Sequence, residues 1–252
     1  MFHRLSLLLT IVFILLTCCA HAQNSTFKTG EFVVAKTANE ILGQEHAKNY
    51  TQFINPDLEI TWEINIPANY DPAYPPGILV YISPQNKIKL PSGWIDVTED
   101  KNLIFIAARK SGNKEPVSKR FAMALLALPL LQATYAINTD RIYISGFSGG
   151  GRVASMVSTS YPQIFKGALY NCGVNFWQDI NSEQLETIKE NRFVFLTGTN
   201  DFNLIDTKKV YSKYKKAGVI NAKLMIVSNM GHSNPRRQKF SQAIEYLDAI
   251  KQ

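Results

Sequence analysis

One stretch of the sequence combines a serine with the small neighbours that a reactive serine needs. Gly146-Phe147-Ser148-Gly149-Gly150 fits the pattern G-x-S-x-G, between an apolar run that ends at Ser145 and a segment with helical spacing. Small flanking residues let a strand and a helix pass closely at such a sharp turn. The helix N-terminus beside the serine offers backbone N–H groups that stabilise developing negative charge. The pattern therefore predicts Ser148 as a nucleophile.

Two alternative interpretations of this glycine-rich turn involve no reactive serine. Gly149–Ala154 also fits G-x-G-x-x-A, a fingerprint of dinucleotide binding. That fold places the turn after its first strand and needs an acidic residue about 20 positions later. Here the turn follows several predicted strands, and Leu169–Gly173 carries no acid. The second alternative is a turn with an incidental serine, which only partner residues elsewhere in the chain argue against.

Two histidines are candidates for the base, because a serine hydroxyl is a weak nucleophile unaided. In chains with this motif the acid and then the histidine follow the serine, each after a later strand. His232 lies in the loop after the last predicted strand and fits the base. His46 lies upstream in a polar segment of helical spacing and is interpreted as a surface residue. A structural role is the alternative for His232.

Asp201 is the candidate for the acid that orients the histidine. It follows the buried run Phe193–Leu196, so its carboxylate is expected at the carboxyl edge of the sheet. Asp206, five residues further on, is the reserve, and Asp179 is a weaker third candidate on a different connection. The alternative role for Asp201 is that of a turn or helix-capping residue.

Short apolar runs alternate with longer segments of helical spacing, which predicts an α/β fold with a mostly parallel sheet and helices on both faces. The runs, rich in Ile, Val, Phe and Tyr, are Ile78–Ile82, Leu103–Ala107, Arg141–Ser145, Phe193–Leu196 and Leu224–Val227. The helical segments are Val117–Ala136, Gly150–Ser160, Ser182–Glu190, Ile205–Ala217 and Pro235–Ile250.

The N-terminal part of the chain differs from this alternation. Glu31–Lys36 and Leu58–Ile66 predict two antiparallel strands at one edge of the sheet. Pro129 is expected to kink or break the predicted helix around it. With 46% hydrophobic and 19% charged residues, and no repeat or linker, the composition excludes disorder. We expect one domain with a sheet of roughly eight strands.

The first 22 residues have the layout of a secretory signal peptide. Basic residues precede the apolar run Leu5–Leu16, and Ala20-His21-Ala22 fits a signal-peptidase site. Cleavage after Ala22 leaves residues 23–252 as a single α/β domain, secreted or periplasmic. A membrane anchor is the alternative, but the run is shorter than the ~20 residues that a spanning helix needs. A lipid on Cys18 or Cys19 is disfavoured, because no small residue precedes Cys18.

Cleavage leaves few side chains for metal or disulfide chemistry. Only Cys172, His46 and His232 remain of the cysteines and histidines. A single cysteine forms no internal disulfide, and this set argues against a zinc site. A carboxylate-rich metal site stays open, although the sequence holds no EF-hand spacing. We expect no cofactor and no metal.

The net charge of +7 raises the question of an anionic partner. The basic residues fall mainly in two short sets with helical spacing, and we interpret these sets as solvated helix faces. We therefore expect no nucleic acid and no stable membrane insertion. The sets are Lys208, Lys209, Lys213, Lys215 and Lys216, and then Arg236, Arg237 and Lys239.

On these residues the chain resembles the α/β-hydrolase superfamily, and within it secreted esterases of the polyhydroxybutyrate-depolymerase and feruloyl-esterase type. The resemblance rests on Asp140–Gly151, on Gly198-Thr-Asn-Asp201 and on Gly231-His232. It implies an α/β-hydrolase fold and a secreted serine esterase. Ser148, Asp201 and His232 would then form a triad that works through an acyl-enzyme.

One segment departs from the pattern of these esterases. After their first buried strand they usually carry His-Gly, and a nearby N–H completes the oxyanion hole. Here Val80-Tyr-Ile82 is followed by Ser83-Pro84-Gln85. Proline has no N–H. Gln85 is therefore the expected second donor, beside the backbone of Gly149.

The nature of the substrate is open at this stage. The connection from Cys172 to Asn191 is too short for a large cap domain, so we expect an open or shallow site that takes a small-molecule or polymer-derived ester. Phe176 and Trp177 could line an acyl or aryl pocket, or pack in the core. An acyltransferase and a non-catalytic binding module on the same scaffold are the alternative functions. The sequence does not indicate the oligomeric state.

Overall fold

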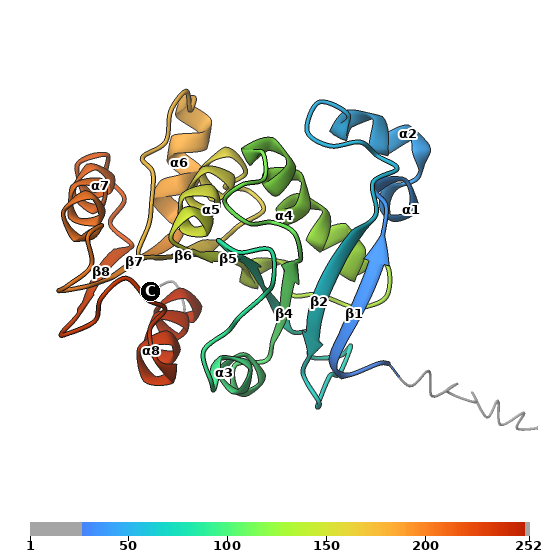
Figure 1. The fold of residues 1–252 in the computed structure, drawn as a ribbon, viewed down its shortest axis with the longest axis horizontal. Coiled ribbons are helices and arrows are strands. Elements are labelled where there is room, and N and C mark those ends of the chain that lie inside the picture. Colours follow the sequence, from blue (N-terminus) through green and yellow to red (C-terminus); the bar gives the residue numbers. More distant parts are fainter. Residues whose placement is uncertain (1–26, 250–252) are drawn as a thin grey trace, which may run out of the picture.

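The computed structural model describes residues 27–249, so the predicted signal segment lies outside the described residues. In that part of the chain eight strands form one sheet, in the order β1-β2-β4-β3-β5-β6-β7-β8 (Figure 1). All pairs from β4 to β8 are parallel, and β2 is antiparallel to both of its neighbours. The strands are β1 Gly30–Lys36, β2 Ile60–Ile66, β3 Gly77–Ile82, β4 Leu103–Ala108, β5 Ile142–Phe147, β6 Gly167–Asn171, β7 Arg192–Gly198 and β8 Ala222–Val227.

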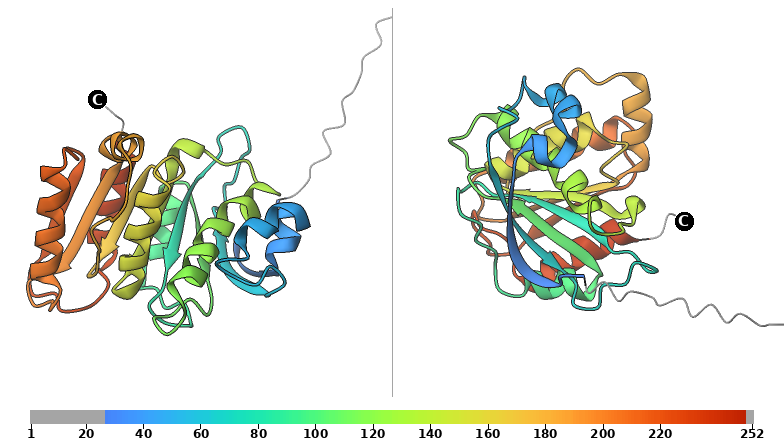
Figure 2. Two further views of the ribbon diagram at one scale, coloured as in Figure 1. Left: turned by 90° about the horizontal axis from the view of Figure 1, so that it is seen from above. Right: turned by 90° about the vertical axis from the view of Figure 1, so that its right-hand side faces the viewer.

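Helices cover both faces of the sheet, as Figures 1 and 2 show. Helices α4 to α7 lie on one face, with α1 and α2 beside them, and α3 and α8 lie on the other. The α-helices are α1 Ala38–Leu42, α2 Gln44–Ala47, α3 Trp94–Asp100, α4 Val117–Gln132, α5 Gly149–Ser160, α6 Ser182–Glu190, α7 Leu204–Lys216 and α8 Arg237–Asp248. Short 3-10 turns occupy Lys48–Tyr50 and Thr139–Arg141.

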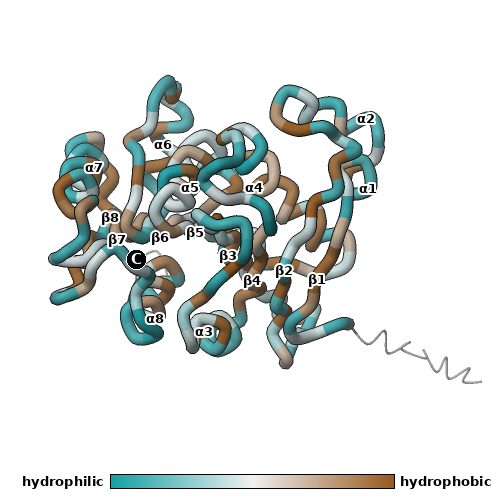
Figure 3. The backbone as a smooth tube through the Cα atoms, in the orientation of Figure 1, coloured by the Kyte–Doolittle hydropathy of each residue, from teal (hydrophilic) through white to brown (hydrophobic). Residues whose placement is uncertain are grey.

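The central strands are buried on both faces because successive side chains point to opposite sides. In β3, Val80 and Ile82 pack in the cluster that includes α4 and α5, while Leu79 and Tyr81 pack with α3 and α8. Hydrophobic stretches accordingly lie mainly on the strands, and hydrophilic ones on loops and outer helix turns (Figure 3). Continuous apolar runs are thus what a doubly covered sheet requires. The predicted mostly parallel sheet with helices on both faces is confirmed.

The predicted elements match the structure closely, and the antiparallel edge of β1 and β2 is confirmed. Strand β6 and helix α3 were not among the predicted elements. Strand β6 was missed because it begins with small residues, Gly167 and Ala168, which are also common in loops. Helix α3 was missed because it is only seven residues long. Pro129 was expected to kink or break this helix, α4, and a break does not occur, since α4 runs through Pro129 to Gln132. Pro129 lies in the last turn, where its missing N–H removes only one bond.

None of the described helices combines the length and apolar character needed to cross a membrane. The sheet topology brings together the loops that carry the candidate site residues. Since β5, β6, β7 and β8 are parallel, the segments that follow them meet at one edge of the sheet. That edge carries the candidate nucleophile, acid and base.

Candidate active site

Ser148 occupies a tight turn between β5 and α5. Its backbone has φ 54° and ψ −120°, a conformation rare for residues with a side chain. Its N–H donates to the carbonyl of Asn171 at 2.8 Å, and its carbonyl accepts from the N–H of Arg152 at 3.1 Å. The turn is thus fastened to β6 on one side and to α5 on the other.

The glycines around Ser148 allow this close packing. A Cβ added at Gly150 would collide with the carbonyl oxygen of Ile82, and one at Gly151 with that of Gly173. At Gly146 it would meet the backbone of Gly150. The glycine spacing in the motif therefore reflects backbone contacts that leave no room for a side chain.

The three residues predicted as a triad lie in one hydrogen-bonded chain. His232 Nε2 is 2.9 Å from Ser148 Oγ, and His232 Nδ1 is 2.8 Å from Asp201 Oδ1. The Asp201 side chain is fully buried, whereas the His232 side chain is 22% exposed. This is the geometry that proton transfer from a serine to a histidine requires.

Asp201 is held as a carboxylate by the groups around it. Burial alone would raise its pKa, but hydrogen bonds from the Asn203 N–H, Thr197 and His232 contribute to lowering the pKa below its ordinary value. The Asn203 N–H lies 3.0 Å from Asp201 Oδ1, and Thr197 Oγ1 donates to Oδ2 at 2.7 Å. A charged carboxylate can fix the histidine tautomer and stabilise an imidazolium.

The other acidic and histidine candidates lie outside this arrangement. Asp206 is exposed in the first turn of α7, and Asp179 is exposed in the segment between β6 and α6. His46 is exposed in α2, as expected. Only Asp201 of the three predicted acids is hydrogen-bonded to His232.

Packing fixes the loop that carries His232. The imidazole stacks on Phe202 with the ring centroids 4.1 Å apart, and Phe147 lies 4.9 Å away on a tilted plane. Behind the loop, Trp94 Nε1 donates to the carbonyl of Pro235 at 3.0 Å, so α3 anchors it. Phe202 itself is 75% exposed and covers the histidine from the solvent side.

The predicted oxyanion donors differ in their surroundings. Gly149 is the first residue of α5, so its N–H has no acceptor within the helix. The Gln85 N–H already donates to Ser83 Oγ at 3.0 Å. The sequence analysis missed Asn113, whose side-chain amide lies where a Cβ on Gly149 would sit. Asn113 belongs to a polar loop without any motif that could have revealed it.

Cys172, Asp201 and His232 also place three possible metal-ligand atoms within 4.8 Å of one another. Hydrogen bonds already engage these groups, since both ring nitrogens of His232 are bonded, one to Asp201 and one to Ser148. Burial, and after it the nearby Asp201 carboxylate, raises the pKa of Cys172 well above its ordinary value, so the thiol stays protonated. It donates to the carbonyl of Ser233 at 3.3 Å. Cys172 is therefore tied to Ser233, the residue that follows His232.

The sequence model of the prolyl oligopeptidase family matches residues 110–250, which include all three triad positions. No curated protein gives a significant match.

Solved structures with the same fold include esterases and peptidases. A ferulic acid esterase, 13% identical, is covered in full and covers 87% of this chain, with a TM-score of 0.62. A mutant feruloyl esterase module from Clostridium thermocellum complexed with sinapinate is 11% identical, with coverages of 86% of this chain and 88% of that one and a TM-score of 0.59.

A putative dipeptidyl aminopeptidase IV from Bacteroides ovatus is 15% identical, with a TM-score of 0.58. The match covers 88% of this chain but only 36% of the peptidase, so the chain spans about a third of that protein. The likeness to these structures confirms the predicted α/β-hydrolase fold and its resemblance to feruloyl esterases. Fold and family together support serine hydrolase activity, and the chain belongs to the prolyl oligopeptidase family.

Proposed function

We propose that the protein is an exported serine hydrolase that cleaves carboxylic esters. The observation that carries the proposal is the hydrogen-bonded chain from Ser148 through His232 to the buried Asp201. It stands at the carboxyl edge of a parallel sheet, on a turn that holds the serine at the N-terminus of α5. A scaffold without catalysis would have no need of all three residues in contact, which argues against a purely binding role.

In the proposed mechanism, Ser148 Oγ attacks the ester carbonyl as His232 Nε2 takes its proton. Asp201 holds the imidazole by Nδ1 and stabilises the positive charge that forms on it. The tetrahedral intermediate expels the alcohol, which leaves with the proton from His232, and an acyl-enzyme remains. Water then attacks the acyl group, again with His232 as base, and releases the acid and free Ser148.

The negative charge on the tetrahedral intermediate needs N–H donors. We assign the Gly149 N–H as the first donor and the Gln85 N–H as the second. Each such donor is worth about 2.7–4 kcal/mol in the transition state. Because Ser83 Oγ holds the Gln85 N–H in the resting structure, the Ser83 hydroxyl must turn away as the intermediate forms.

Ester cleavage is favoured over peptide cleavage by the extent of the structural likeness. The chain covers the whole of the ferulic acid esterase but 36% of the dipeptidyl aminopeptidase. The family match to prolyl oligopeptidases makes hydrolysis of a peptide bond the second candidate. Both reactions would use the same triad and differ in the leaving group.

The test uses the protein of residues 23–252 and measures whether it hydrolyses a series of p-nitrophenyl esters and a matched peptidyl p-nitroanilide. We expect turnover of short esters that is lost in Ser148→Ala and His232→Ala. His46→Ala is the matched control, because His46 is the exposed histidine and should leave the rate unchanged. Equal rates in all four proteins would overturn the proposal, and cleavage of the anilide alone would replace esters by peptides.

Export is tested separately. Residues 1–22 are proposed to act as a cleaved signal peptide. N-terminal sequencing of the protein from the periplasm or culture medium should begin at Gln23. Recovery of the intact N-terminus in the cytoplasm would contradict this part of the proposal.

A further inference from the structure

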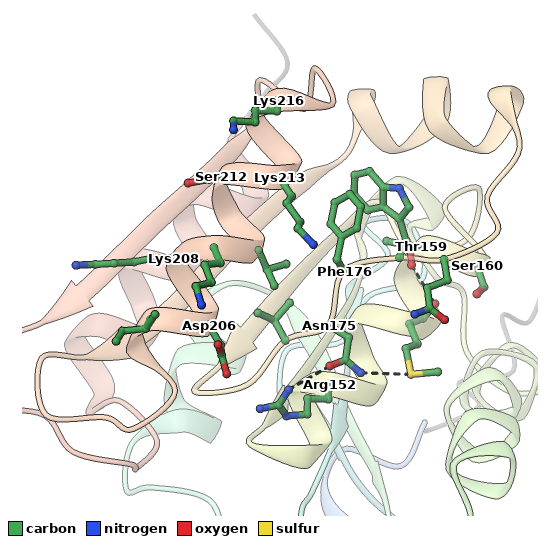
Figure 4. Close-up of a pocket in the computed structure, with 17 residues that line it drawn as sticks. Arg152, Thr159, Ser160, Asn175, Phe176, Asp206, Lys208, Ser212, Lys213 and Lys216 are labelled. Atoms are coloured by element: carbon green, nitrogen blue, oxygen red, sulfur yellow. Dashed lines mark hydrogen bonds between the residues drawn. The ribbon is translucent and has the colours of Figure 1, made fainter.

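A groove lies between α5 and α7. It encloses about 970 Å³ and is closed on one side by the segment Val174–Gln178, which follows β6 (Figure 4). That volume suits a ligand of drug size. The three candidate triad residues do not line the groove themselves. Arg152, which lines it, lies one helical turn after Ser148 and is hydrogen-bonded to Asn203, whose N–H donates to Asp201.

The lining of the groove is strongly positive. It holds five cations, of which four come from α7, against a single carboxylate, Asp206. No ion pair joins any of the five to a carboxylate within residues 27–249. Like charges on one wall repel each other, so an anion in the groove would be favourable. The cations are Arg152, Lys208, Lys209, Lys213 and Lys216.

Arg152 is a fixed cation with donors to spare. Its Nη1 donates to Asn175 Oδ1 at 3.2 Å and its Nη2 to Asn203 Oδ1 at 3.1 Å, and both partners are neutral amides. A guanidinium carries five N–H donors in a planar fork that matches a carboxylate. These two bonds hold the half-buried side chain in place and leave its charge uncompensated. Through Asn203, whose N–H donates to Asp201, it is also adjacent to the triad.

Aromatic rings supply the apolar part of the groove. Phe176 and Trp177 stack with their centroids 4.2 Å apart, and Trp177 meets Tyr214 edge-on at 4.4 Å. Lys213 Nζ lies 5.1 Å from the centre of the Phe176 ring. Both expectations for Phe176 and Trp177 therefore hold in part, since they pack on Tyr214 and line the groove. A ligand with an apolar chain or ring and an anionic end fits this surface.

We propose that the groove binds the acidic part of the substrate, so that the enzyme prefers esters carrying a carboxylate. The carboxylate pairs with Arg152 and the lysines of α7 while the scissile ester lies at Ser148. This inference rests on the proposed ester hydrolysis and names its substrate class.

Two matched substrate pairs test the preference for charge. One is p-nitrophenyl hydrogen adipate and its methyl ester, with the carboxylate in the acyl part. The other is 4-acetoxybenzoate and its methyl ester, with the carboxylate in the alcohol part. Binding is measured by calorimetry on Ser148→Ala, which should not hydrolyse them, and turnover is measured on the wild type. We expect the charged member of at least one pair to bind about tenfold more tightly or better.

Substitutions locate the effect. Arg152→Gln in the Ser148→Ala background should reduce the ratio of the two affinities to near one. Lys215→Gln is the matched control, because Lys215 is exposed on α7 but does not line the groove, and the ratio should stay at its starting value. Should Arg152→Gln disturb folding, Lys208→Gln with Lys213→Gln provides a second variant that should lower the ratio.

The outcomes separate the two proposals. Equal affinity for both members of each pair would overturn the groove proposal, whether or not the esters are cleaved. So would a charge preference that survives in Arg152→Gln and in the double lysine variant. A charge preference without any turnover by the wild type would leave the groove standing and would instead contradict ester hydrolysis at Ser148.

Discussion

The triad and the groove differ in whether their polar side chains are paired. Hydrogen bonds join Ser148 to His232 and His232 to Asp201, and the Asp201 carboxylate also accepts from Thr197 and from the Asn203 N–H. The groove lining holds five cations against one carboxylate, Asp206, and within residues 27–249 none of the five forms an ion pair. A closed network fixes one geometry and so suits chemistry, whereas unpaired charges suit the recognition of a ligand. Changes at the triad should therefore alter kcat, and changes in the groove should alter selectivity.

The largest expected effect belongs to the acid of the triad. Asp201→Asn keeps the side-chain shape but removes the charge that fixes the histidine tautomer, and should lower kcat by about 10⁴. Asp179→Asn is the control, because Asp179 is exposed and asparagine tolerates its positive φ of 54°. The measurement is the kcat of both variants with a neutral ester, from steady-state kinetics. A similar kcat in the two variants would remove Asp201 from the mechanism.

The next effect concerns the packing that supports the centre. Gly150→Ala places a Cβ against the carbonyl oxygen of Ile82 and should lower the free energy of unfolding by about 3 kcal/mol. Gly231→Ala is the matched control, since a Cβ there meets nothing within 4 Å, and its effect should stay within about 0.5 kcal/mol. Urea unfolding measures both. Equal free energies of unfolding in the two variants would show that the backbone around Gly150 can shift to accept a Cβ, contrary to the prediction.

The dependence of kcat/KM on ionic strength should distinguish the role of the groove from that of the triad. Raising the ionic strength from about 0.01 to 0.15 M shortens the screening length from about 30 to 8 Å and weakens attraction between exposed charges. For the substrate pair that shows a preference for charge, the kcat/KM of the carboxylate-bearing ester should fall about fivefold. The kcat/KM of its methyl ester should stay constant. An equal response of the two esters would assign the salt effect to the protein as a whole.

The smallest effect is expected for Asn113, which lies beside Gly149 at the edge of the centre. With the Gln85 N–H as the second oxyanion donor, Asn113→Ala should change kcat by less than about threefold. A loss of 10²–10³, the size seen when one such donor is removed, would transfer the role to the Asn113 amide. The kcat for one neutral ester settles the assignment.

The sequence contained enough to predict most of the sheet and the residues now found in contact at its carboxyl edge. Ser148 could be found because the backbone contacts of its turn demand glycines at fixed spacing. Asp201 and His232 could be found because each follows an apolar run that forms a strand, although only β7 is buried and β8 is a partly exposed edge strand. These signals are local, so a single sequence can carry them.

The groove could not be predicted, because it depends on which helices lie side by side across the sheet. Its two walls, α5 and α7, are separated along the chain by β6, α6 and β7. The lysines of α7 looked like a solvated face, and Lys215 indeed lies outside the groove lining. Nothing in the spacing indicated that Lys208 and Lys213 would face the same cavity as Arg152. Likewise, the engagement of the Gln85 N–H by Ser83 depends on a loop conformation.

The most direct test of the account is the reaction of the folded protein with a fluorophosphonate, followed by peptide mass spectrometry. The account predicts a single phosphonyl group on Ser148, absent in Ser148→Ala and formed far more slowly in His232→Ala. Such a result would establish an activated serine at this turn independently of the natural substrate. A folded wild-type protein that remains unmodified, or that is labelled at another serine, would contradict the central claim.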